Sequence, residues 1–127
     1  MARETFFTNP DKKPAGFSPA TRVGNQIFIS GHVSVDAQGN IVGEGDAGAQ
    51  SEQVFKNLEA ALTVAGATWA DVTKITCFML HREDYPAYAA VRLRYFPENG
   101  PASSTVFIPG LVRPEYLIEI EAIAVLE

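Results

Sequence analysis

The chain has 127 residues, of which 46% are hydrophobic, and this size predicts one domain that spans residues 1–127. The net charge of −5 argues against a nucleic-acid partner, because phosphate contacts require clustered Lys and Arg. No apolar run reaches the roughly 20 residues of a membrane-spanning helix, and a single Cys is typical of a cytoplasmic protein.

The N-terminal part of the sequence predicts a short antiparallel meander. Gly24-Asn25 is a turn signal between two strand-like segments, residues 17–23 and 26–30, and a second turn follows at residues 36–40. His32 lies just after the second segment. Its imidazole suits acid–base chemistry near neutral pH, but the simpler interpretation is a structural His in a turn.

A long helix is expected next, from about Ala47 to Ala65. Asp46 is a suitable N-cap, and Gly66 follows the expected end. The apolar residues of this segment repeat at helical spacing and form one stripe, from which Gln50 is offset. The pattern therefore indicates a helix that packs one face on a sheet.

The second half of the sequence alternates strands and a helix. Residues 72–80 are apolar on both faces, which is typical of an interior strand. A helix over residues 85–96 and strands over residues 102–108 and 116–126 follow. This order predicts an α+β fold, a mixed sheet with two helices on one face. The second face then lacks cover within the chain, so we expect self-association.

The last strand carries two carboxylates. By period-2 alternation, Glu119 and Glu121 share a face with Ile123 and Val125. Such a carboxylate is either a charge at the rim of the sheet or a half-buried group with an altered pKa. No cluster of residues has metal-ligand spacing, so no metal site is predicted. Cys77 lies in mid-strand and is interpreted as a small core residue.

Several segments resemble the Rid family, the reactive intermediate deaminases also called YjgF-like proteins. They are IFISGHVSVD, NIVGEGDAGAQSEQVFKNLEAALTVAGATWADVTKITCFML, GPASSTVFIPGL and LIEIEAIAV. The resemblance implies a chorismate-mutase-like fold and a homotrimer with clefts between subunits. It also implies hydrolysis of small imine or enamine metabolites, such as 2-iminopropanoate, with no metal or organic cofactor.

At the site, the chain both matches and departs from this family. Gly31 matches a backbone contact and Glu121 matches a water-handling carboxylate. Ser103 stands where the family has the Arg that binds the substrate carboxylate, since Pro-Ala-Arg-Ser is replaced by Pro-Ala-Ser-Ser. Further altered contacts are Ala20, Ala89 and Thr105. The candidate substrate-binding residues are Gly31, His32, Ala89, Ser103 and Thr105, and the candidate catalytic residue is Glu121.

Three interpretations remain open. The chain is a hydrolase that has diverged toward a substrate other than 2-iminopropanoate, or it is a metabolite-binding or regulatory trimer without turnover. In the third interpretation a relocated cation restores the carboxylate contact that Ser103 cannot make, since a hydroxyl does not replace a bidentate guanidinium. The candidates for this cation are Arg22, Arg92, Arg94 and Arg113.

Overall fold

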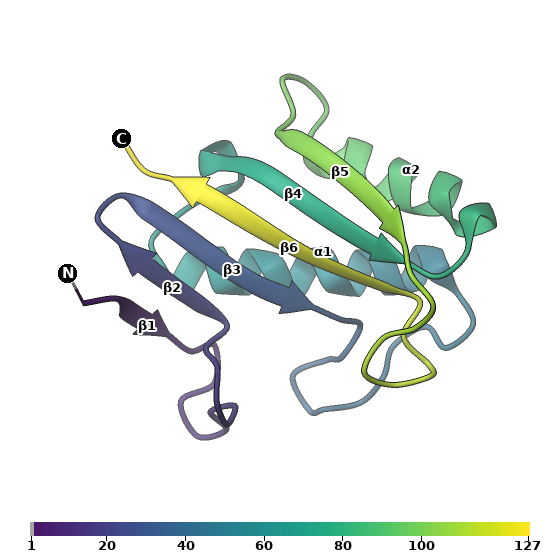
Figure 1. The fold of residues 1–127 in the computed structure, drawn as a ribbon, viewed down its shortest axis with the longest axis horizontal. Helices are drawn as coiled ribbons and strands as arrows, with labels where there is room; N and C mark the ends of the chain where they lie inside the picture. Colours follow the sequence, from purple (N-terminus) through teal and green to yellow (C-terminus); the bar gives the residue numbers. More distant parts are fainter. Residues whose placement is uncertain (1) are drawn as a thin grey trace.

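The computed structural model describes residues 2–127 and shows a six-stranded mixed sheet with two α-helices packed on one face (Figure 1). The strands lie in the order β1-β2-β3-β6-β4-β5, and of the neighbouring pairs only β4 and β5 are parallel. The strands are β1 (Glu4–Phe6), β2 (Ala20–Val23), β3 (Gln26–His32), β4 (Val72–Met79), β5 (Ala102–Phe107) and β6 (Ile118–Val125). The predicted α+β arrangement is confirmed.

The helix α1 (Ala47–Val64) forms as the sequence predicts. The Asp46 carboxylate accepts a hydrogen bond from the Ala49 N–H at 3.0 Å, which satisfies one of the unpaired donors at the helix start. Gly66 follows the helix with a φ of +85°, a left-handed conformation that glycine adopts without strain. The apolar stripe of α1 is buried against the sheet.

The two helices cover only one face of the sheet. Along β6, Ile118, Ile120, Ala122 and Ala124 are buried under the helices, whereas the residues between them face away. Figure 1 looks onto this second face, which we call the open face, with both helices behind the sheet. Apolar side chains remain exposed there, among them Phe28, Val106 and Val125. The chain therefore has an apolar surface that none of its own helices covers.

Some boundaries differ from the sequence-based prediction. β1 was not predicted, because it has only three residues and pairs at the edge of the sheet with β2. The helix α2 (Tyr85–Tyr95) follows a short 3-10 turn, Arg82–Asp84, and the Asp84 side chain makes no capping hydrogen bond. β2 is shorter than the predicted segment, starting at Ala20.

None of the helices in residues 2–127 combines the length and the apolar character that a membrane-spanning helix needs.

Gln50 is the main polar residue in the core, although its offset from the apolar stripe suggested exposure. Its side chain is fully buried. The amide Nε2 donates to the Gly43 carbonyl at 3.1 Å and to the Glu115 carbonyl at 2.9 Å, and Oε1 accepts from the Leu117 N–H at 2.9 Å. Gln50 therefore ties α1 to the loop that leads into β6.

We predict that Gln50→Leu lowers the free energy of unfolding by about 2–4 kcal/mol, because buried backbone groups lose their partners. Denaturant unfolding followed by circular dichroism measures this loss. Lys56→Leu, on the exposed side of the same helix, is the control and should change stability little. An equally small loss for Gln50→Leu would contradict this role.

Candidate functional site

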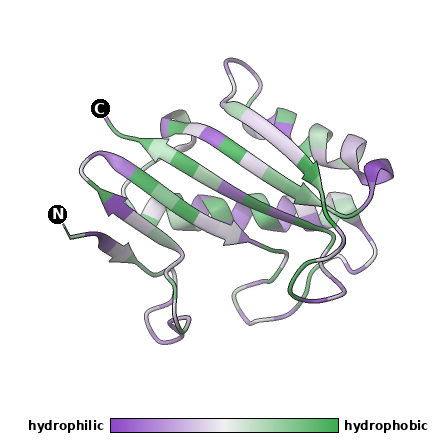
Figure 2. Ribbon diagram, in the orientation of Figure 1, coloured by the Kyte–Doolittle hydropathy of each residue, from purple (hydrophilic) through white to green (hydrophobic). Residues whose placement is uncertain are grey.

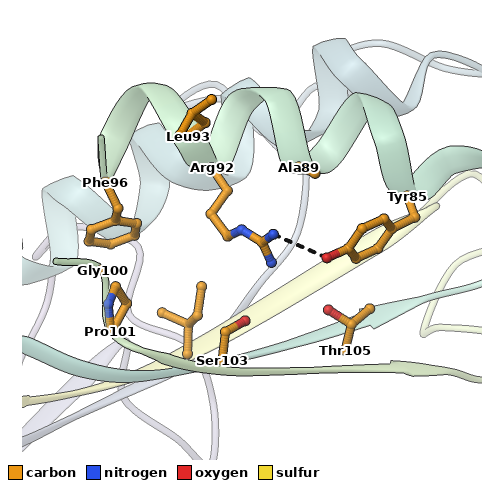
Figure 3. Close-up of a pocket in the computed structure, with 10 residues that line it drawn as sticks. Tyr85, Ala89, Arg92, Leu93, Phe96, Gly100, Pro101, Ser103 and Thr105 are labelled. Atoms are coloured by element: carbon orange, nitrogen blue, oxygen red, sulfur yellow. Dashed lines mark hydrogen bonds between the residues drawn. The ribbon is translucent and has the colours of Figure 1, made fainter. Parts of the chain in front are cut away.

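A cavity of about 650 Å³ lies between α2 and the edge strand β5 (Figure 3). One wall is the face of α2 that looks toward the sheet, and the other is β5 with the loop before it. The lining residues are Ile75, Tyr85, Ala89, Arg92, Leu93, Phe96, Gly100, Pro101, Ser103 and Thr105. Three of the predicted substrate-binding residues, Ala89, Ser103 and Thr105, are therefore brought together here.

The register of β5 explains why its hydroxyls face the cavity. Ser103 pairs with Ile75 and Thr105 pairs with Cys77 in the parallel ladder. Ile75 and Cys77 are fully buried under the helices, so the residues beside them point the same way. In Figure 2, β5 is pale over most of its length, whereas β3, β4 and β6 carry green bands between purple or pale ones. The wall of the cavity is thus polar where the rest of this face is apolar.

Arg92 projects from α2 toward these hydroxyls (Figure 3). Its Nη2 donates a hydrogen bond to the Tyr85 hydroxyl at 3.1 Å. The guanidinium also lies over two aromatic rings, 5.6 Å from the centroid of Tyr85 and 5.1 Å from that of Tyr88. Cation–π contacts of this kind hold the group in place while leaving donors for an anion. Arg92 is thus a cation inside the cavity.

The other three candidate cations lie elsewhere. Arg22 donates from Nε to the Gly24 carbonyl at 2.8 Å. Arg94 forms an ion pair with Glu52 at the surface. Arg113 forms another with Glu115, in which Nε lies 3.5 Å from Oε2. Within residues 2–127, Arg92 forms no ion pair with a carboxylate. Sequence reasoning could not single out Arg92 because it could not show which side of α2 faces β5.

Two buried groups lie behind the cavity wall. Burial raises the pKa of the Cys77 thiol to about 12, so the residue is a neutral core side chain, as predicted. Burial also raises the pKa of Tyr88 to about 12. The Tyr88 hydroxyl is near Arg92 and Ser103, yet it forms no hydrogen bond with any of residues 2–127. A polar donor therefore lies unsatisfied beside the cation.

The carboxylates of β6 lie on the open face, away from this cavity. Glu119 is half-buried beside Gly31, where an added Cβ would lie 2.5 Å from the Glu119 Oε2. Any larger residue at position 31 would require the Glu119 carboxylate to move. Burial, and then repulsion by Glu121, raises the pKa of Glu119. Glu121 is exposed on the same face, so the geometry favours Glu119 as the carboxylate beside Gly31.

The remaining candidates do not line the cavity. His32 is partly buried, and its Nδ1 lies 2.7 Å from the Ser30 carbonyl oxygen. Burial lowers the pKa of His32, opposed by that hydrogen bond, so the ring is neutral near pH 7. Ala20 is fully buried in the core. Among residues 2–127, no three His, Cys, Asp or Glu side chains gather in a metal-binding arrangement.

The raised pKa of Glu119 predicts a pH-dependent stability. Between its ordinary pKa of 4.5 and the raised value, the folded protein keeps a proton that the unfolded chain releases. Stability from this group is therefore lost as pH rises through that window. We expect Glu119→Gln to raise the melting temperature at pH 7 and to change it little at pH 4. Glu121→Gln, at the exposed carboxylate, should give a smaller gain, and an equal gain would contradict the assignment to burial.

The comparisons with known proteins agree with this fold. The sequence pattern of the family described as Endoribonuclease L-PSP matches residues 9–126. A protein of Acinetobacter baylyi named 3-aminoacrylate deaminase RutC is 39% identical over 98% of both chains. A protein of Dermatophagoides farinae named 2-iminobutanoate/2-iminopropanoate deaminase is 33% identical over 91% of this chain and 90% of its own.

The solved structures give the same result. The crystal structure of an endoribonuclease homologue from Thermotoga maritima superposes with a TM-score of 0.86 at 37% identity, over 98% of this chain and 99% of that one. The family match spans nearly the whole chain, and the resemblance found in the sequence is confirmed. The chain belongs to the Rid, or YjgF-like, family, whose pattern bears the description Endoribonuclease L-PSP.

Proposed function

We propose that the protein is a cofactor-independent deaminase that hydrolyses imine or enamine derivatives of carboxylic acids. The observation that supports this most is the position of Arg92, a cation without an ion-pair partner among residues 2–127, in a cavity with two hydroxyls. A guanidinium binds a carboxylate through paired, charge-assisted hydrogen bonds. Arg92 therefore takes the role that Ser103 cannot take. The deaminases among the named relatives support the reaction class.

The site is completed by a second copy of the chain. Arg92 and Glu119 lie on opposite faces of the sheet, so one chain cannot bring both to the same substrate. A contact in which the open face of one copy covers the cavity of the next would join them. Such a contact uses different patches on the two partners and closes into a ring. A homotrimer with three intersubunit clefts fits this requirement and also covers the exposed apolar surface.

The chemistry at this shared site is a simple hydrolysis. Water adds to the carbon of the C=N bond, that bond breaks, and the nitrogen leaves as ammonia to give a 2-oxo acid. Arg92 holds the carboxylate, and Glu119 of the second copy accepts a proton from water and returns it to the leaving nitrogen. A carboxyl with a raised pKa suits both transfers, because it exchanges protons nearer to neutral pH. No electrons are gained or lost.

We predict that Arg92→Gln lowers kcat/KM for a 2-imino acid by roughly 30- to 1000-fold, or about 2–4 kcal/mol of transition-state binding. The loss of kcat/KM is measured as ammonia release from imines that an amino-acid oxidase generates in situ. Arg94→Gln is the matched control, since Arg94 lies on the same helix but pairs with Glu52. Wild-type turnover by Arg92→Gln would show that another group binds the carboxylate.

The shared site predicts complementation between inactive variants. Light scattering should first show a trimer at micromolar concentration. When Arg92→Gln and Glu119→Gln chains are co-expressed with different tags and the doubly tagged trimers are purified, about one third of their clefts should hold both native groups, because each mixed ring contains one such cleft. Activity should therefore return to about one third of the native level. Mixed trimers as inactive as either parent would contradict a site shared between copies.

A further inference from the structure

The cavity beside Arg92 has two chemically different ends. Figure 3 shows Tyr85, Arg92, Ser103 and Thr105 toward one end, where a hydroxyl or guanidinium projects from each residue. Phe96, Gly100 and Pro101 lie at the other end, with Leu93 above. Ile75 adds a further apolar side chain to the lining. A ligand that matches this surface has an anionic head and an apolar tail.

The size of the cavity also exceeds the needs of a small acid. Its volume of about 650 Å³ falls in the range of roughly 300–1,000 Å³ that is typical of pockets for larger ligands. A three-carbon acid held by Arg92 would leave the apolar end of the cavity unfilled, also when a second copy closes the cleft. A larger tail would fill this space and bury apolar surface on both partners.

Leu93 is a further indication that the cavity binds a ligand with an apolar tail. Its side chain is 62% exposed although it lines the cavity, so the fold itself gains little from it. Leu93 lies one position after Arg92 on α2, at the outer rim of the cavity and above the Arg92 side chain in Figure 3. An exposed large apolar side chain at the rim of a cavity is a suitable contact for a ligand tail.

We propose that the substrates of this protein are 2-imino or enamine acids with a large apolar side chain, aromatic or branched aliphatic, in preference to 2-iminopropanoate. This inference rests on the proposed function and names the substrate class of the same site. The carboxylate lies at Arg92, Ser103 and Thr105, and the tail lies against Leu93, Phe96 and Pro101. Hydrolysis consumes one water and gives ammonia and a 2-oxo acid that keeps the tail.

Two measurements test the proposal. Imines are generated in situ from alanine, leucine and phenylalanine, and ammonia release gives kcat/KM for each. Calorimetry then compares the binding of pyruvate and phenylpyruvate, the corresponding products. We expect the phenylalanine- and leucine-derived imines to exceed the alanine-derived imine by roughly 10- to 100-fold in kcat/KM, because each extra buried apolar group adds discrimination. Phenylpyruvate should bind more tightly than pyruvate by a similar factor.

A substitution at Leu93 tests where the apolar tail of the substrate binds. Leu93→Ser should reduce kcat/KM for the phenylalanine-derived imine by about 3- to 10-fold and reduce it less for the alanine-derived imine. Val112→Ser is the control, since Val112 is 90% exposed and does not line the cavity. Equal losses on both imines, or no loss for Leu93→Ser, would overturn the placement of the tail.

The outcomes separate the two proposals. Equal or faster turnover of the alanine-derived imine overturns the preference for large tails but leaves the deaminase function standing. An absence of turnover on every imine, together with tighter binding of phenylpyruvate, overturns the deaminase function while supporting a bulky acid as the ligand. Weak and equal binding of both oxo acids, without turnover, overturns both.

Discussion

The alternation of side chains along the strands separates the functional groups of this chain into two sets. In β5 it turns Ser103 and Thr105 toward α2, and in β6 it turns Glu119 and Glu121 toward the open face. Because the period of a strand is two residues, no local rearrangement can move one group to the other face without moving the whole strand. A site that uses both sets therefore depends on contact between copies, and the apolar open face makes such contact favourable.

The cation of the cavity comes from the helix and not from the strand. β5 contributes the small side chain of Ser103, and Arg92 lies on α2 opposite it. A guanidinium on a helix needs support to stay oriented, and the rings of Tyr85 and Tyr88 provide it. Because Ser103 and Thr105 are small, the cavity keeps open space beside the Arg92 guanidinium.

Much of the fold could be predicted because its signals are local. The stripe of α1 with Asp46 before it and Gly66 after it defined that helix, and alternation in β6 identified its buried side. The burial of Gln50 could not be predicted, because it depends on carbonyls and an N–H from distant loops. The three-residue β1 has too few residues for a periodic pattern. These features depend on tertiary contacts.

The same limit applied to the site. The sequence placed Arg92 among four candidate cations and gave Glu119 and Glu121 nearly equal surroundings. Only the fold shows that Arg92 faces the β5 hydroxyls and that Gly31 makes room for Glu119. The pairing has a chemical consequence, since a carboxyl that is half-buried beside a second carboxylate holds its proton more tightly than an isolated one. A group of that kind can take a proton from water and deliver it to a leaving nitrogen within one turnover. A larger residue at position 31 would displace the Glu119 carboxylate from the half-buried position that raises its pKa, so the proton affinity of Glu119 depends on the space beside Gly31.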